Sequence, residues 1–279
     1  MTVGLLHPGA MGAAVGAQLV ANGVRTLWVE DGRGTATRRR AEEAGLVAVP
    51  GLGGLAECSI VVSICPPASS LDVAQAVAAT DFQGVYLDAN AISPGHARQI
   101  ETLFAERGGV AVVDGGVVGP PPHKPGTSRL YLSGPGDAVR EIHDLFAPTT
   151  LQPVVLEGPV GQASALKLSF ATYNKISYAL AAQAYALAEH HGVHNELRDL
   201  AGAVLPNTPF GKPDQIATAG QRAWRWEGEM AEIGAACVDA SVPDDMLRAA
   251  EGTFAAWTAF KNDETVTLHQ LLAALHKAL

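Results

Sequence analysis

The stretch that decides the fold is Val3-Gly4-Leu5-Leu6-His7-Pro8-Gly9-Ala10-Met11-Gly12. Its apolar start predicts a buried strand, and a helical pattern follows over Met11–Asn22. A dinucleotide fold uses this order, because the turn brings backbone to a pyrophosphate and the helix N-terminus points free N–H groups at the negative charge. Gly9 and Gly12 hold the second and third glycine positions of that fingerprint, and His7 stands at the first. The predicted cofactor turn comprises His7, Pro8, Gly9, Ala10, Met11 and Gly12.

Short apolar runs alternate with amphipathic stretches through the first half of the chain. The predicted strands are Val3–Leu6, Thr26–Glu30, Ile60–Ile64, Val85–Leu87, Val110–Val113, Leu130–Ser133 and Val154–Leu156. The predicted helices between them are Met11–Asn22, Thr35–Ala44, Ser70–Ala79 and Pro94–Arg107. This alternation predicts an α/β domain with a Rossmann-type parallel sheet that helices cover on both faces.

The pattern changes after Gly161. No Gly or Pro occurs from Ala163 to His191, which predicts one helix of about 28 residues. The later apolar runs are also helical in spacing: Leu197–Val204, Ala223–Ala240, Asp244–Lys261 and Thr265–Leu279. We therefore expect a Rossmann domain over residues 1–158 and an all-helical substrate and dimerisation domain over residues 159–279, with the long helix between them.

The composition narrows the class of protein. A net charge of −9 disfavours nucleic acid and membrane surfaces as partners. Cys58, Cys65 and Cys237 have neither metal-ligand nor redox spacing, so we expect no metal site and reduced thiols. Because the first strand is predicted to start at Val3, we expect no leader, and no apolar run is long enough to cross a bilayer. These features predict a cytoplasmic protein with a small-molecule substrate.

The end of the second predicted strand bears on the choice of cofactor. Glu30 stands where a carboxylate accepts hydrogen bonds from an adenine ribose, which favours NAD. Arg33, Thr35, Thr37 and Arg38 follow it and have the chemistry to hold a 2′-phosphate. The alternative is an exposed polar loop. On balance the sequence slightly favours NADP(H) over NAD(H).

Two further loops follow the predicted strands at Ile60–Ile64 and Val85–Leu87. The carboxyl ends of parallel strands form the ligand crevice, so these loops are expected to border the nicotinamide. We therefore assign Cys65, Pro66 and Asn90 to the cofactor and Ser93 to the substrate. An equally open alternative is that Asn90 and Ser93 only cap the next helix.

With these features the chain resembles the β-hydroxyacid dehydrogenase family, which includes 3-hydroxyisobutyrate and 6-phosphogluconate dehydrogenases and is related to the imine reductases. The likeness spans essentially the whole length. The HPGAMG turn resembles the family's GLGxMG signature, and Asp114–Gly119 resembles its substrate loop. Gly161 and Lys167 have the spacing of its catalytic helix. More narrowly, the turn, the Cys-Pro-Pro loop and Glu229–Ile233 are similar to an uncharacterised branch that binds NAD and is 6-phosphogluconate dehydrogenase-like.

The resemblance implies that Lys167 is the general acid/base and that Val118 and Gly119 border the substrate. A cleft beside a nicotinamide cation lowers the pKa of a lysine, which suits proton transfer. Asn174 and Tyr178 follow Lys167 on one helix face, and we expect them to contribute a catalytic and a substrate contact. Alternatively both are hydrogen-bonded at a subunit interface. Relatives commonly dimerise through this domain, so a homodimer is expected.

Three departures from the family pattern leave the substrate open. Ala171 stands where the family usually has Asn, and Val118-Gly119-Pro120 replaces Ser-Gly-Gly. The lysine that commonly binds the acid's carboxylate has no counterpart near Gly228 and Glu229. The favoured function is NAD(P)-dependent hydride transfer between nicotinamide and a secondary alcohol or carbonyl carbon. Imine reduction is one alternative, and an inactive nucleotide-binding sensor or scaffold is another.

Overall fold

The computed structural model describes residues 1–276 and divides the chain into two compact units, Met1–Leu168 and Ser169–Leu279. The division falls after Leu168, whereas the sequence placed it after residue 158. Residues 277–279, the end of the last predicted helix and of the predicted second domain, lie outside the described residues.

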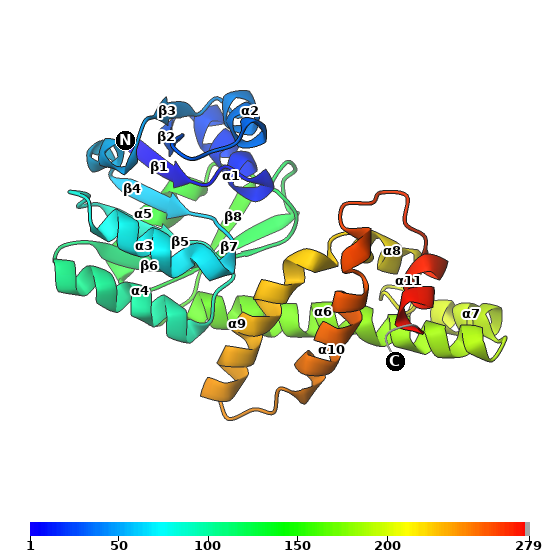
Figure 1. Ribbon diagram of the computed structural model, residues 1–279. Helices are drawn as coiled ribbons and strands as arrows, with labels where there is room; N and C mark the ends of the chain where they lie inside the picture. The colour runs from blue at the N-terminus through cyan, green and yellow to red at the C-terminus, as the bar shows by residue number, and fades with distance from the viewer. Residues whose placement is uncertain (277–279) are drawn as a thin grey trace. The chain divides into compact units, whose positions relative to one another are not determined.

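The first unit is built on one eight-stranded sheet with the order β3-β2-β1-β4-β5-β6-β7-β8 (Figure 1). Its strands are β1 (Thr2–Leu6), β2 (Arg25–Val29), β3 (Val47–Val49), β4 (Ile60–Ser63), β5 (Val85–Asp88), β6 (Ala111–Val118), β7 (Ser128–Ser133) and β8 (Leu151–Val155). All neighbouring strands run parallel except β6 and β7, which pair antiparallel. The predicted Rossmann-type sheet is confirmed, with the difference that residues 119–127 return the chain as a hairpin because no crossover helix fits in so short a connection.

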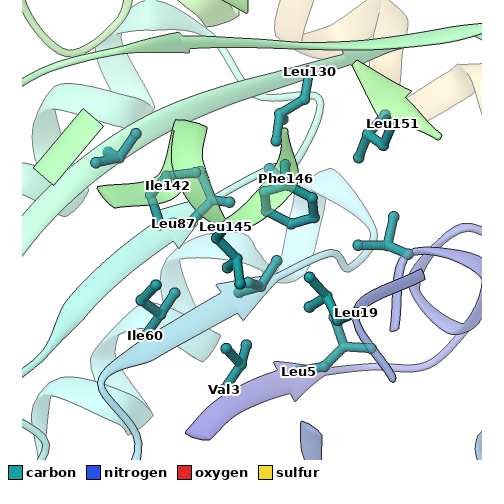
Figure 2. Close-up of a cluster of buried hydrophobic side chains, with 14 of the residues drawn as sticks. Val3, Leu5, Leu19, Ile60, Leu87, Leu130, Ile142, Leu145, Phe146 and Leu151 are labelled. Carbon is teal, nitrogen blue, oxygen red and sulfur yellow. The ribbon is translucent and has the colours of Figure 1, made fainter. Parts of the chain in front are cut away.

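Helices cover both faces of this sheet, as expected. They are α1 (Ala10–Ala21), α2 (Thr35–Glu43), α3 (Ser70–Ala78), α4 (Pro94–Arg107) and α5 (Gly136–Phe146). On one face, Leu19 of α1 and the α5 residues Ile142 and Phe146 lie among strand residues such as Leu5 and Leu87 (Figure 2). On the other face a separate core gathers strand residues with α3 and α4, including Val61, Tyr86, Val77, Ile100 and Phe104. Burial on both faces explains why the strands are continuous apolar runs.

The second unit is helical within the described residues. Its elements are α6 (Gln162–His190), which begins before the division, α7 (His194–Val204), α8 (Asp214–Gly220), α9 (Trp226–Asp239), α10 (Asp245–Ala256) and α11 (Leu268–Leu275). Trp257 is fully buried and donates from Nε1 to the Leu271 carbonyl at 3.2 Å, which ties the end of α10 to α11. Tyr185 of α6 donates to the Phe210 carbonyl at 2.7 Å. Among residues 1–276, every helix falls short of the length or the hydropathy that a bilayer crossing requires.

Candidate active site

The turn between β1 and α1 has the geometry of an anion site. Gly9 is the N-cap of α1, and within the described chain this cap lacks a side-chain partner and the first turn lacks an acidic residue. A Cβ on Gly12 would lie 2.6 Å from the His7 carbonyl oxygen, so the turn requires glycine there. His7 itself has φ +65°, the left-handed conformation that favours glycine at the first fingerprint position. The residues present therefore fit a pyrophosphate against the α1 N-terminus.

A cavity of about 350 Å³ lies at the carboxyl ends of β1 and β2 and beside α3. Its polar lining consists of His7, Asp31, Arg33 and Asp72, and its apolar lining includes Leu6, Leu52 and Val73. The cavity lies on the side of β1 that the second strand occupies, where a dinucleotide fold holds the adenosine. This position fits a nucleoside next to the pyrophosphate turn.

His7 and Arg33 form the polar centre of that cavity. Arg33 Nη2 lies 2.6 Å from His7 Nε2. Burial, reinforced by the charge of Arg33, lowers the pKa of His7 to about 4, so the imidazole is neutral at physiological pH. Across the described residues, His7 Nδ1 and Arg33 Nε are buried without a hydrogen-bond partner. Such unsatisfied donors are uncommon in folded proteins.

Glu30 and Arg38, both predicted near the adenine ribose, pair with each other. Arg38 Nη1 binds Glu30 Oε2, and Arg38 Nη2 donates to the Glu30 carbonyl at 3.2 Å. Arg38 Nε donates to the Arg33 carbonyl at 3.1 Å, which holds the loop after β2 against α2. In the described structure neither Glu30 nor Arg38 lines the cavity, whereas Asp31 and Arg33 do.

Asn90 links the ends of β4 and β5. Its Nδ2 donates to Ser63 Oγ at 3.2 Å and to Asp88 Oδ2 at 2.9 Å, and its Oδ1 accepts from the Cys65 backbone N–H at 2.6 Å. Both amide hydrogens are therefore engaged inside the protein. Through the bond from the Cys65 N–H, Asn90 holds the backbone of the loop at Cys65 in position. Ser93 is the N-cap of α4 and accepts from the His96 N–H at 3.3 Å, as the capping alternative expects.

Asp88 is the buried carboxylate at this edge of the sheet, and sequence reasoning did not single it out. Burial raises the pKa of Asp88 to about 7, which hydrogen bonds from Asn90 and the charge of Lys167 oppose and the charge of Asp114 reinforces. Near neutral pH this carboxyl can therefore hold or release a proton. The charge of Lys167, the smallest of these effects, favours the ionised form of this carboxyl.

Lys167 is positioned by the start of α6. Asp114 of β6 is buried and accepts from the Gly161 and Ser164 N–H groups, each at 2.9 Å, and from Ser164 Oγ at 2.6 Å. Gly116 lies beneath the helix, because a Cβ there would meet the Ala163 carbonyl oxygen at 2.8 Å and Lys167 Cβ at 3.2 Å. A buried cap and a close glycine contact thus fix the first turns of α6 on the sheet.

The stretch expected to be a substrate loop is mostly strand. β6 continues through Val118, so residues 114–118 pair with β7 and only Gly119 leaves the sheet. Gly119 has φ +124°, and a Cβ there would lie 2.4 Å from the Thr127 carbonyl oxygen. Val118 and Gly119 therefore lie at the hairpin end of β6.

The predicted contacts on α6 beyond Leu168 belong to the second unit. Tyr178 packs against Trp226 with ring centroids 5.7 Å apart, while Asn174 is half-buried. Sequence reasoning missed Lys175, whose Nζ lies 3.4 Å from Glu229 Oε2 and 4.2 Å from the centre of the Trp226 ring. Burial lowers the pKa of Lys175, against the opposing charge of Glu229. The signal available in the sequence was a second lysine on the predicted long helix.

The three cysteines are not joined by disulfide bonds. Burial raises the pKa of Cys65 to about 12, with the charge of Asp88 adding to the effect, so the thiol is protonated and unreactive. Cys58, Cys65 and Cys237 are free thiols. Among residues 1–276, no group of three or more His, Cys, Asp or Glu side chains is arranged to hold a metal ion.

Comparisons with known proteins show which sequence profile and which solved structures the chain resembles. Residues 188–257 match a sequence profile described as a domain of unknown function (DUF1932). The 3-hydroxyisobutyrate dehydrogenase of Mycobacterium tuberculosis, solved with L-serine, superposes with a TM-score of 0.78 at 18% identity and 98% coverage of both chains. Psf3, solved with NADP+ and 2-OPP, gives 0.72 at 17% identity and covers 98% of this chain and 99% of its own.

A reductive aminase from Aspergillus terreus, solved with NADPH4, cyclohexanone and allyl amine, is also similar, with a TM-score of 0.62, 18% identity and coverage of 99% and 98%. No curated protein matches the chain. In its fold, the protein is therefore similar both to the β-hydroxyacid dehydrogenases and to the reductive aminases, which confirms the resemblance drawn from the sequence at the level of architecture.

Proposed function

We propose that the protein is an NAD(P)-dependent oxidoreductase of the β-hydroxyacid dehydrogenase type. It transfers a hydride between nicotinamide and a secondary alcohol or carbonyl carbon of a small molecule. The observation that carries the proposal is the position of Lys167 at the carboxyl edge of the sheet. A Cβ on Gly116 of β6 would lie 3.2 Å from Lys167 Cβ, and the charge of Lys167 acts on the buried carboxyl of Asp88 at the end of β5. The NADP+ and NADPH complexes of proteins with this fold support a nicotinamide cofactor.

The cofactor is assigned to the carboxyl ends of the strands. The α1 N-terminus, with His7, Pro8, Gly9, Ala10, Met11 and Gly12, would hold the pyrophosphate. Arg33 and the cavity beside it would hold the adenosine end, with NADP(H) slightly favoured over NAD(H). Cys65 and Pro66 would border the nicotinamide, with Asn90 keeping their loop in place.

In this proposal Lys167 moves the proton at the substrate oxygen. A bound nicotinamide supplies or accepts the hydride. Lys167 donates a proton to the oxygen when the carbonyl is reduced and takes it back when the alcohol is oxidised. Asp88, protonated in part near neutral pH, balances the charge of the lysine between the two states. Asn174 is the second proposed catalytic residue, and the proposed substrate contacts are Ser93, Val118, Gly119 and Tyr178.

Imine reduction is the second candidate, because a reductive aminase has the same fold. The replacement of Ser-Gly-Gly by Val118-Gly119-Pro120 removes polar groups that would bind an acid, which favours an apolar imine. The retained Lys167 favours the alcohol or carbonyl reaction, in which an oxygen exchanges a proton.

Nicotinamide absorbance separates these candidates. The purified chain is supplied with NADPH or NADH and with a panel of small 2- and 3-oxo acids, uncharged ketones and cyclic imines. Oxidation of the cofactor with the carbonyl compounds supports the proposal, and oxidation with imines alone replaces it by imine reduction. Nucleotide binding without turnover of any compound in the panel would leave the sensor or scaffold alternative.

We further propose that the protein works as a cytoplasmic homodimer. Phe170, Tyr173, Leu180 and Leu187 of α6 are 52%, 73%, 61% and 61% exposed. Their alternating spacing of three and four residues, continued by Ser177 and Ala184, forms one stripe along the helix. We call these four residues the α6 stripe. Large apolar side chains aligned in this way mark a contact surface, and a second copy of the chain presents a complementary one.

A further inference from the structure

We propose that His7 is a positioning residue that fixes Arg33 for a phosphate on the adenosine ribose, so that the histidine of the glycine turn selects the 2′-phosphorylated cofactor. This inference rests on the nucleotide site of the proposed function. It gives the departure from the glycine fingerprint a role in recognition.

The contact between the two side chains has a defined direction. A guanidinium keeps all its protons in proteins, so Arg33 Nη2 donates and His7 Nε2 accepts across their 2.6 Å separation. The imidazole that accepts at Nε2 carries its proton on Nδ1. Because the pKa of His7 is lowered to about 4, the histidine remains an acceptor through the neutral range. His7 therefore restrains the orientation of a side chain that would otherwise keep several freely rotating bonds.

Two donors of this pair still lack acceptors. Among the described residues, His7 Nδ1 and Arg33 Nε are buried and unpartnered. Leaving a buried donor unsatisfied costs about 1–3 kcal/mol. A phosphate offers several strong acceptor oxygens, and a guanidinium binds them through parallel hydrogen bonds. A small turn of the pair toward the cavity would satisfy both donors at once.

The location of the cavity shows that Arg33 faces the ribose phosphate of the cofactor and not its pyrophosphate. The lining of the cavity comes from the ends of β1 and β2, from residues 51–52 and from α3, and within the described chain it excludes the α1 turn of Gly9 to Met11. The pyrophosphate belongs to that turn, so the phosphate beside Arg33 is the one on the ribose.

Because the surrounding charges are negative, binding of a phosphate in this cavity depends on the position of Arg33. Asp31 and Asp72 are exposed and also line the cavity, and their charges oppose a phosphate. Arg38, which donates to the Arg33 carbonyl, is paired with Glu30. A glycine at position 7 would leave Arg33 unrestrained in a cavity whose other charges are negative.

Calorimetric binding of two nucleotides to the full chain tests the inference without any turnover. Adenosine 2′,5′-bisphosphate carries the ribose phosphate, and adenosine 5′-monophosphate lacks it. The variants are His7→Gly, Arg33→Ala and their combination. Arg39→Ala is the matched control, because it removes an exposed arginine that pairs with Glu43 at the surface. Glycine accepts the positive φ of position 7, so His7→Gly keeps the turn.

The wild-type chain is expected to prefer the bisphosphate by about tenfold or more, the effect of one or two charge-assisted hydrogen bonds. His7→Gly and Arg33→Ala should each remove most of this preference, and the combination should remove no more than Arg33→Ala alone. Binding of the monophosphate should change by less than about twofold, and Arg39→Ala should match the wild type.

An unchanged preference in His7→Gly would overturn the role of His7, and so would a wild-type chain that does not distinguish the two nucleotides. Both results leave the nucleotide site intact. Absence of binding of either nucleotide would instead remove the cofactor site itself, and the proposed function with it.

Discussion

Asp88 shows how a single residue acquires chemistry from its surroundings. Its carboxyl is 1% exposed, receives two hydrogen bonds from Asn90 and is electrostatically coupled to both Lys167 and Asp114. Desolvation outweighs these hydrogen bonds and the lysine charge, which is why the group can be protonated near neutral pH. The same residue on a surface would remain ionised.

This raised pKa predicts a pH-dependent stability. The folded pKa is about 7 and the ordinary value is 3.8, so the contribution of Asp88 is greatest below about pH 4 and declines as the pH rises through 7. Each pKa unit corresponds to about 1.4 kcal/mol. Asp88→Asn should therefore gain stability relative to the wild type between pH 4 and 7, by a few kcal/mol at most, and show a constant difference above pH 8. Urea unfolding at a series of pH values measures this.

Asp137→Asn is the matched control, because that side chain is 99% exposed. It should follow the wild type at every pH. Parallel curves for Asp88→Asn and the wild type would show that Asp88 is ionised throughout.

Residue-level sequence reasoning located the glycine turn, Arg33 and Lys167 because their signals lie in local spacing. It did not foresee Asp88, since a strand-terminal Asp looks the same whether it is buried or exposed. It also could not pair Glu30 with Arg38, because these residues, eight positions apart, meet only when the loop after β2 folds back on α2. Burial and partner choice come from tertiary packing, which spacing does not encode.

At the scale of elements, the start of α6 depends on one carboxylate. Asp114 accepts the two backbone N–H groups that begin the helix and two serine hydroxyls. Asp114→Asn retains one acceptor oxygen and adds a donor that faces other donors, so it should lower the free energy of unfolding by about 1–3 kcal/mol. Ser164→Ala, which removes one of these contacts, should cost less. Equal stability of Asp114→Asn and the wild type in chemical denaturation would contradict this role.

The contact between β6 and α6 requires a glycine. Gly116→Ala would place a Cβ 2.8 Å from the Ala163 carbonyl oxygen, so the helix must shift, at a cost of about 1–3 kcal/mol. Turnover should fall as well, because Lys167 moves with the helix. Gly234→Ala in α9 is the control, since its Cβ would meet nothing within 4 Å, and helix propensity predicts a gain of up to about 1 kcal/mol. Thermal unfolding and initial rates are measured for both variants. Wild-type stability and wild-type turnover in Gly116→Ala would refute the contact.

Elements with strong periodicity were predicted to within a few residues: α4 has the expected bounds, and α6 begins and ends one residue early. β3 and α5 were missed for different reasons. β3 has three residues, two of them exposed at the edge of the sheet, and so short a run is a weak strand signal. α5 follows a Gly-Pro turn and its polar start obscures the apolar face of Val139, Ile142 and Phe146. β6 was expected to end at Val113, because the glycines that follow suggested a loop.

For the whole molecule, the α6 stripe predicts the oligomeric state. The wild-type chain should sediment as a dimer, and Leu180→Glu should yield monomers because a charge buried in an apolar interface is unpaired. Gln83→Glu adds the same charge at an exposed position outside α6 and should remain dimeric. Sedimentation velocity distinguishes the two species. A monomeric wild type, or a dimeric Leu180→Glu, would exclude this surface.

The central claim is that Lys167 exchanges a proton with the substrate while the cofactor is held elsewhere. The most direct measurement pairs the turnover of Lys167→Ala with its affinity for NADPH by fluorescence titration, using Lys124→Ala, an exposed lysine, as the control. We expect Lys167→Ala to lose turnover by about 10²- to 10⁴-fold while its cofactor affinity stays within about twofold of the wild type. Near-normal turnover by Lys167→Ala would contradict it.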